Sequence, residues 1–178
     1  MDNDIDFKKT ERNRKAITIL SVIIVLTLAF IWLHSCMDKE DSSEESNFVY
    51  ELLCPFFEIF MGKGNVTEHF IRKLAHFTEF FGLGLELMLY MRLLFLNVKP
   101  ILPVNAWILG TFCALVDETI QLFSGRGSMV QDVWLDSAGC FMGIIVMLMI
   151  VLVSDGKRTK KNLKNQILRN KNRTSGFE

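Results

Sequence analysis

Apolar residues along this chain gather in long runs that polar segments separate. The first run covers residues 16–33, AITILSVIIVLTLAFIWL, and holds no charged residue. An α-helix of about 20 apolar residues crosses the roughly 30 Å hydrocarbon core of a bilayer. A secretory signal peptide would have a shorter apolar core followed by an A-x-A-like cleavage site, which this stretch lacks. The run therefore predicts an uncleaved membrane-spanning helix.

Three further runs predict spans at about 71–96, 101–123 and 133–153. The run at 71–96 is mostly apolar, although it also contains His76 and Glu79. The bilayer core offers no water to backbone N–H and C=O groups, so in so few spans only helices satisfy them. The pattern predicts an all-α integral membrane protein, a bundle of four transmembrane helices.

The distribution of charge predicts how these helices are oriented. Half of the residues are apolar and the formal net charge is zero. However, Lys and Arg dominate residues 154–178 and cluster at residues 8–15, next to the first apolar run, whereas acids dominate residues 34–69. Lys and Arg are retained on the cytoplasmic side of a membrane. We therefore expect a multi-pass protein of the cell membrane with both termini cytoplasmic, a membrane domain at 16–153 and an outer loop at 34–69.

The basic C-terminal tail directly follows a predicted span. Its attraction to the anionic inner leaflet accounts for the charge, and we expect no nucleic-acid partner.

The outer loop contains an apolar pattern of its own. Phe48, Leu52, Phe56 and Phe60 recur every four residues. This spacing is typical of a helix that lies in the outer membrane interface, and it equally suits a cap packed on the bundle. Cys36 and Cys54 both lie in the predicted outer loop. Whether they form a disulfide stays open.

The predicted topology brings polar residues from three runs to one depth near the outer face. They are Arg72, Lys73, His76 and Glu79 from the second run, Asp117, Glu118, Gln121 and Arg126 from the third, and Asp132 and Asp136 from the fourth. An unpaired charge at the bilayer centre costs about 2.5–3.5 kcal/mol. We therefore expect either Arg72 or Lys73, and also Arg126, to pair with Asp117, Glu118 and Asp132. We expect His76 to lie close to Glu79.

Small residues continue the inward face of the fourth run. Asp132, Asp136, Gly139 and Gly143 follow a spacing of four, three and four residues, so they share one face of a helix. Glycines four residues apart let a neighbouring helix approach closely. The pattern predicts helix packing at Gly139 and Gly143.

Three interpretations of the polar cluster stay open from the residues alone. It is a network of ion pairs that holds the helices in register, a binding site in which Arg72, Lys73 and Arg126 meet a phosphate, or the active site of an intramembrane enzyme. The acid, base and catalytic candidates for an enzyme are His76, Glu79, Asp117, Glu118 and Asp132. We expect no metal and no cofactor, because only one histidine falls in the cluster and no H-E-x-x-H motif exists; His34 and His69 are interpreted as interfacial residues.

Two segments resemble the motifs of the VanZ-like family. RKLAHFTEFFGLG (72–84) resembles its first motif, a basic residue followed by A-H-F-x-E-Y/F and an L-G pair. DETIQLFSGRGSMVQDVWLDSAGCFMG (117–143) resembles its second, D-E-x-x-Q-x-F, then G-R, then D-x-x-x-N/D-x-x-G-x-x-x-G. The matching positions are Lys73, His76, Glu79, Asp117, Glu118, Gln121, Arg126, Asp132, Asp136 and Gly139. Phe80 and Asp136 depart from the family's more common Tyr and Asn.

The resemblance implies a function in the bacterial cell envelope. The family is named for a protein that gives low-level resistance to teicoplanin, a lipoglycopeptide antibiotic. On that basis we expect binding of a membrane lipid, a lipid-linked cell-wall precursor headgroup or the glycopeptide itself, at Arg72, Lys73, Gln121, Arg126 and Asp136. The alternative is an enzyme that acts on a lipid or isoprenoid-linked substrate.

Overall fold

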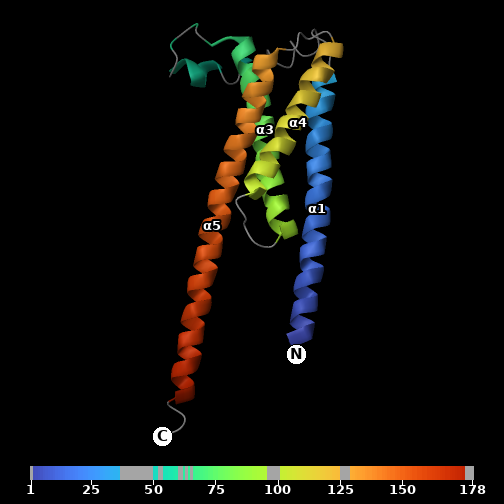
Figure 1. Cartoon of the computed structure of the whole chain (residues 1–178). Coiled ribbons are helices and arrows are strands. Elements are labelled where there is room, and N and C mark those ends of the chain that lie inside the picture. The colour runs from blue at the N-terminus through green and yellow to red at the C-terminus, as the bar shows by residue number, and fades with distance from the viewer. Residues whose placement is uncertain are drawn as a thin grey trace.

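The computed structural model of the chain is helical and describes residues 2–36, 50–51, 54–59, 62, 64, 66–95, 101–124 and 129–174. Its long helices are α1 (Asp2–Cys36), α3 (Glu68–Phe95), α4 (Ile101–Phe123) and α5 (Val130–Thr174). Successive helices run in opposite directions, so the two termini lie at the same end of the molecule (Figure 1). The prediction of an all-α protein is confirmed over the described residues.

Two helices continue well beyond the predicted spans. α1 begins at Asp2 instead of residue 16, and α5 ends at Thr174 instead of residue 153. The basic tails contain good helix formers such as Lys and Arg and no proline, so nothing stops the helix at the end of the apolar run. The helix ends therefore do not coincide with the expected ends of the spans.

Three described helices are long and apolar enough to cross a membrane, over Asn13–Cys36, Ile101–Phe123 and Val130–Ile167. α3 is not among them, because polar residues such as His76, Glu79 and Glu86 interrupt its apolar sequence. However, α3 packs against α1, α4 and α5. Its polar side chains can therefore face neighbouring helices rather than lipid.

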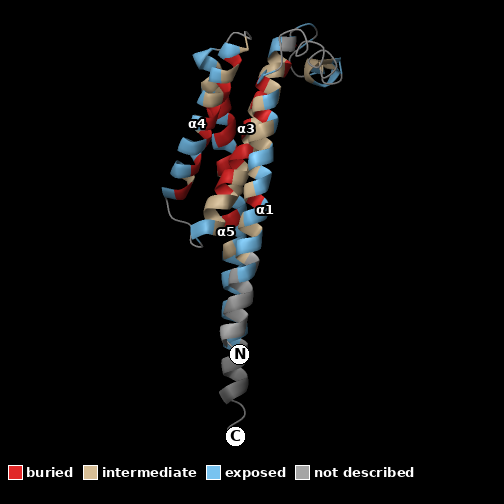
Figure 2. Ribbon diagram, turned by 90° about the vertical axis from the view of Figure 1, so that its right-hand side faces the viewer, coloured by how far each residue is buried: buried red, intermediate tan, exposed pale blue. Residues whose placement is uncertain are grey.

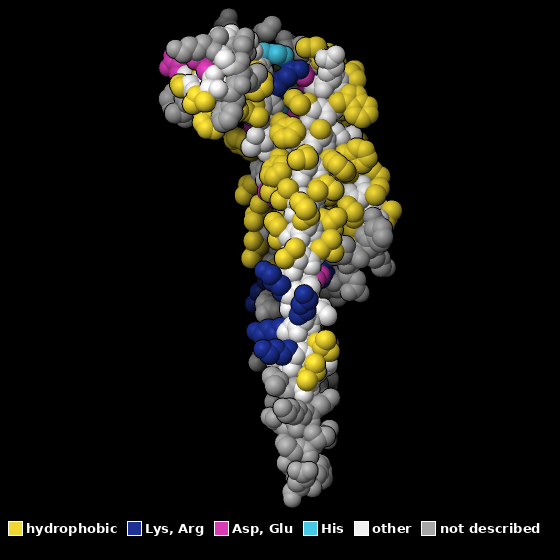
Figure 3. Space-filling view, turned by 90° about the vertical axis from the view of Figure 1, so that its left-hand side faces the viewer, with side chains coloured by type: hydrophobic (Ala, Val, Ile, Leu, Met, Phe, Trp, Pro, Cys, Tyr) yellow, Lys and Arg dark blue, Asp and Glu magenta, His cyan; other side chains and the backbone are white. Residues whose placement is uncertain are grey.

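The core of the bundle is built around α3. Phe80, Leu83 and Met88 of α3 are completely buried, together with Ile31 of α1 and Ala106 of α4. Buried positions face the space between the helices, and exposed positions face outward (Figure 2). Hydrophobic side chains cover most of the bundle on the face shown in Figure 3, and many large hydrophobic residues of α1, α4 and α5 are exposed. An apolar surface of this extent is typical of contact with lipid.

Glycines allow α5 to lie directly on α3. A Cβ added at Gly139 would meet the carbonyl oxygen of Phe77 at 2.5 Å, and one at Gly143 would overlap the carbonyl oxygen of Phe81. On the α3 side, a Cβ at Gly84 would overlap the backbone of Cys140. The two backbones are therefore in contact at positions where no larger residue fits.

The described part of the outer loop packs on α3. Residues 54–59 are helical, and the ring of Phe57 meets that of Phe70 edge to face at 5.7 Å. Phe56 and Ile59 are exposed, so one face of this helix packs on the bundle and another faces outward. The pattern residues Phe48, Leu52 and Phe60 lie outside the described residues. Cys36 and Cys54 are free thiols in the part of the chain that the structure describes.

The contact between α3 and α5 can be tested with a matched pair of glycines. We expect Gly84→Ala to destabilise the protein by about 1–3 kcal/mol, because the new methyl group must displace the backbone of α5. Gly82→Ala, two residues away, has nothing within 4 Å of its added Cβ and should stabilise α3 by up to about 1 kcal/mol. Thermal unfolding of both variants in detergent measures the difference; equal stability would contradict the close packing.

Candidate functional site

A polar cluster occupies the interior of the bundle at the end opposite the termini. Because the helices alternate in direction, the end of α1, the start of α3, the end of α4 and the start of α5 meet at this level (Figure 1). The buried polar side chains there are Ser35, His76, Asp117, Glu118, Gln121, Asp136 and Ser137. Four helices therefore contribute side chains to the cluster, instead of the three that were predicted, because α1 also supplies Ser35.

Asp117 of α4 is the most enclosed carboxylate of the cluster. It has no exposed surface. Ser35 Oγ donates a hydrogen bond to its Oδ1 at 2.7 Å, and Gln121 Nε2 donates one to its Oδ2 at 2.8 Å. His76 Nδ1 lies 3.9 Å from the same Oδ2. Residues of three helices thus hold this carboxylate in one orientation.

Two histidines stack beside this carboxylate. The rings of His34 and His76 are 5.7 Å apart and nearly parallel, at 15°. Glu79 lies between them, with Oε1 3.2 Å from His34 Nδ1 and Oε2 3.6 Å from His76 Nδ1. His76 therefore lies close to Glu79, as predicted.

The interpretation of His34 as an ordinary interfacial residue is wrong. The predicted topology already placed the last turn of α1 at the depth of His76, which is the signal that could have identified it. The expectation of a single histidine in the cluster was wrong for the same reason.

The predicted pairing of Arg72 or Lys73 with an acid is present through Lys73. Lys73 Nζ lies 2.5 Å from Asp132 Oδ1, which joins α3 to the first turn of α5. Among the described residues, Arg72 pairs with no acid; its Nη2 lies 3.1 Å from His69 Nδ1, one helical turn away. Arg126 lies outside the described residues, so its pairing stays a prediction.

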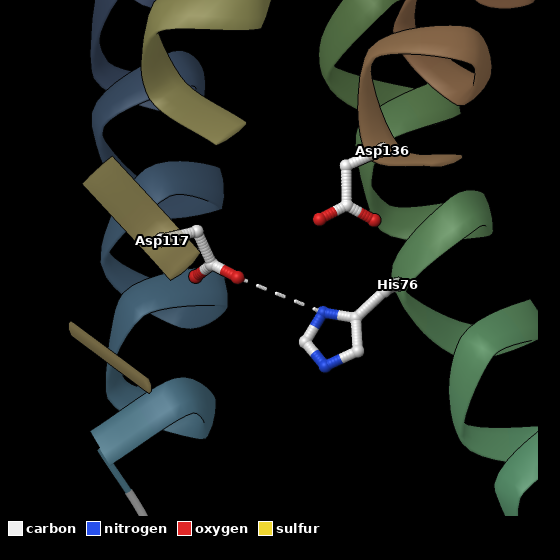
Figure 4. A group of neighbouring side chains, drawn as sticks. All are labelled: His76, Asp117 and Asp136. Carbon is white, nitrogen blue, oxygen red and sulfur yellow. Dashed lines mark ion pairs between the residues drawn. The ribbon is translucent and has the colours of Figure 1, made fainter. Parts of the chain in front are cut away.

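Asp136 of α5 has a different environment from the other acids. It is 1% exposed, and neither of its carboxylate oxygens has a hydrogen-bond partner among the described residues. Its carboxylate points toward Asp117 and His76 (Figure 4). One potential ligand atom from each of these three residues lies within 4.8 Å of the others.

A cavity of about 160 Å³ opens beside this group. Residues of α3, α4 and α5 line it, namely His69, Arg72, Lys73, His76, Glu118, Gln121, Leu135, Asp132 and Asp136, together with Met129. The α3 wall supplies Arg72 and Lys73, and the other two helices supply carboxylates. The sequence candidates therefore converge on one cavity, except Arg126, which is not described, and Glu79 and Asp117, which lie behind its lining.

The model of the VanZ/LLP1 family matches residues 20–152, which is more than half of the chain. The chain belongs to the VanZ/LLP1 family. Comparisons with curated proteins and with solved structures gave no match. Family membership and the apolar helices together make this a VanZ-like membrane protein.

Other polar contacts of this VanZ/LLP1 protein lie away from the cavity. Thr27 of α1 donates a hydrogen bond to Glu86 Oε1 at 2.9 Å, and Arg92 lies 2.9 Å from Asp155 toward the terminal end of the bundle. The indole N–H of Trp107 donates to Ser137 Oγ at 3.0 Å. These contacts join neighbouring helices and satisfy polar groups that would otherwise face apolar surroundings.

The arrangement combines two kinds of chemistry at one cavity. Arg72 and Lys73 provide charged donors of the kind that bind phosphate or carboxylate groups. His76, with carboxylates nearby, provides a group that can accept or donate a proton, or bind a metal ion. Ser35 and His34 were absent from the sequence candidates, because α1 carries no family motif that would have drawn attention to them.

The Lys73–Asp132 pair can be tested by a double-mutant cycle. We expect Lys73→Met and Asp132→Asn each to destabilise the protein, and the double variant to lose less than the sum of the two. The two groups are in contact, so a coupling free energy of about 0.5–3 kcal/mol is expected. Unfolding in detergent provides the four stabilities; strictly additive effects would show that the pair contributes nothing.

Proposed function

We propose that this VanZ/LLP1 protein crosses the cell membrane four times, with both termini in the cytoplasm. α3 supplies the fourth crossing, since it runs antiparallel to α1 and α4 within the same bundle (Figure 1). Lys and Arg side chains gather beyond the apolar surface, toward the termini (Figure 3). This charge distribution favours a cytoplasmic location for that end, and the polar cluster then lies near the outer face.

The orientation can be tested with cysteine labelling in intact cells. In a variant that keeps only Cys54, we expect a membrane-impermeant maleimide to react, because this residue belongs to the outer loop. In a cysteine-free background carrying Thr159→Cys, on the exposed part of α5, we expect labelling only after the cells are opened. The reverse pattern would place the cavity at the cytoplasmic face and contradict the proposal.

We further propose that the cavity binds the phosphate-bearing headgroup of a membrane lipid or a lipid-linked cell-wall precursor. The observation that supports this is the cavity itself, with Arg72 and Lys73 on one wall, inside a bundle whose outer surface is apolar. A guanidinium group offers a planar fork of donors that matches phosphate oxygens. The acyl or isoprenoid chain of such a ligand would remain in the surrounding bilayer.

The size of the cavity favours a small group over a whole antibiotic. Clefts that enclose drug-sized ligands have volumes of about 300–1,000 Å³, whereas this cavity has about 160 Å³. A phosphate and its nearest atoms therefore suit it better than a glycopeptide. On this proposal, low-level resistance to teicoplanin-type glycopeptides arises because a precursor held by the protein is less available to the drug.

Headgroup binding can be tested by replacing one arginine at a time. Loss of a charged hydrogen bond costs about 1.5–3 kcal/mol, so we expect Arg72→Gln to weaken binding roughly tenfold to a hundredfold. Native mass spectrometry of the purified protein with phosphate-bearing lipids measures the bound fraction. In a host that depends on the protein for resistance, the same variant should restore teicoplanin susceptibility.

The matched control is Arg92→Gln, which removes an arginine of the same helix that pairs with Asp155 away from the cavity. Lipid binding and resistance should persist in this variant at equal protein level. Equal loss in both variants would contradict a specific role for the cavity. Glu118→Gln and Arg126→Lys, scored in the same way, show whether the acidic wall and the outer turn contribute.

A second candidate function is catalysis on the same lipid or isoprenoid-linked substrate. The observation that favours it is the position of His76, buried against Asp117 and Glu79 and exposed to the cavity on another side. A histidine oriented by a carboxylate can act as a general base or acid. A modified lipid that disappears in His76→Gln, with lipid binding retained, would favour the enzyme over the binding protein.

A further inference from the structure

Asp136 is a buried carboxylate whose charge no described neighbour neutralises through a hydrogen bond or an ion pair. Its side chain is 1% exposed and both oxygens lack a hydrogen-bond partner among the described residues. Of the described Lys and Arg residues that line the cavity beside it, Lys73 lies against Asp132 and Arg72 against His69. A buried ionised carboxylate without a hydrogen-bond partner is strongly unfavourable. A counter-charge from outside the chain would resolve this.

The neighbours of Asp136 are the residue types that bind divalent metals. Asp117 comes from α4 and His76 from α3, and all three residues are buried. Figure 4 shows the three side chains directed toward a common space between the helices. Their potential ligand atoms lie within 4.8 Å of one another. Ligands bound to one Zn²⁺ at about 2.0–2.2 Å lie roughly 3–4 Å apart, so a small inward shift brings the three atoms onto one ion.

We propose that His76, Asp117 and Asp136 bind one divalent transition-metal ion, Zn²⁺ or Mn²⁺. An imidazole nitrogen together with two carboxylate oxygens is a donor set suited to these ions. Two carboxylates and one divalent cation sum to zero charge, which suits a site sheltered from water. Three protein ligands leave a position for water or a substrate oxygen, and His76 and Asp136 both adjoin the cavity.

The surrounding residues hold two of the proposed ligands in place. Ser35 and Gln121 donate hydrogen bonds to the two oxygens of Asp117, and the ring of His34 stacks on that of His76. Such outer contacts orient metal ligands and raise affinity in known sites. The site stands on this geometry and does not rest on headgroup binding, although a metal at the base of the cavity would add a cation for a phosphate.

The test uses the full-length protein purified in detergent and stripped with a chelator. Isothermal titration with Zn²⁺ and Mn²⁺, followed by elemental analysis after dialysis, should give one ion per chain. We expect Asp136→Asn to weaken metal binding at least about tenfold. Loss of a residue that only supports a metal ligand already lowers affinity by about tenfold to a hundredfold, and Asp136 is proposed to be a ligand itself. The control is Glu86→Gln. Glu86 also has a buried carboxylate oxygen with no hydrogen-bond partner, but it belongs to no group of potential metal ligands among the described residues. The metal affinity of this variant should be unchanged.

A thermal shift separates metal binding from folding. Metal that binds the folded state raises the wild-type Tm, and the rise should be smaller in Asp136→Asn and in Ser35→Ala, which loosens Asp117. Absence of stoichiometric binding to the wild type, or equal affinity in Asp136→Asn, would overturn the proposal. Repeating the lipid-binding measurement of the wild type and of Arg72→Gln on chelator-treated protein separates the two proposals, because headgroup binding can then be scored without the metal.

Discussion

The architecture of this protein depends on keeping charged and polar side chains away from lipid. An unpaired charge in the bilayer costs several kcal/mol, and this chain carries many such residues within its apolar runs. The bundle directs them inward, where Ser35, Gln121 and Lys73 supply partners for acidic side chains. The outer surface can then be almost entirely apolar. The inward polar cluster and the apolar outer surface therefore both follow from the need to keep polar side chains away from lipid.

α3 shows how this constraint determines the order of the helices. Its own sequence is too polar to qualify as a membrane span by length and composition, yet it packs against all three of the other long helices. Glycines on α5 and on α3 allow their backbones to touch, which brings Asp132 and Asp136 within reach of Lys73 and His76. Close packing and polar contacts thus support each other along the same interface.

The cluster divides into two regions with different properties. Toward the rim, Arg72 and Lys73 present cationic groups to a cavity and suit an anionic headgroup. Deeper in the bundle, His76, Asp117 and Asp136 form a compact acidic group with an unsatisfied carboxylate. A cation in the deeper region would complement both the protein and a phosphate above it. Binding and catalysis would then use the same few residues, and the choice between them depends on what occupies the open position.

The sequence by itself determined the class of the protein, because long apolar runs and sorted charges follow directly from the energetics of a bilayer. It also identified most residues of the cluster, such as Lys73 and Asp136, since the predicted topology places them at one depth near the outer face. It did not reveal His34 and Ser35, which carry no local pattern, or that Arg72 turns to His69. Only the tertiary structure decided these pairings, because they depend on how helices distant in sequence are rotated and packed against one another.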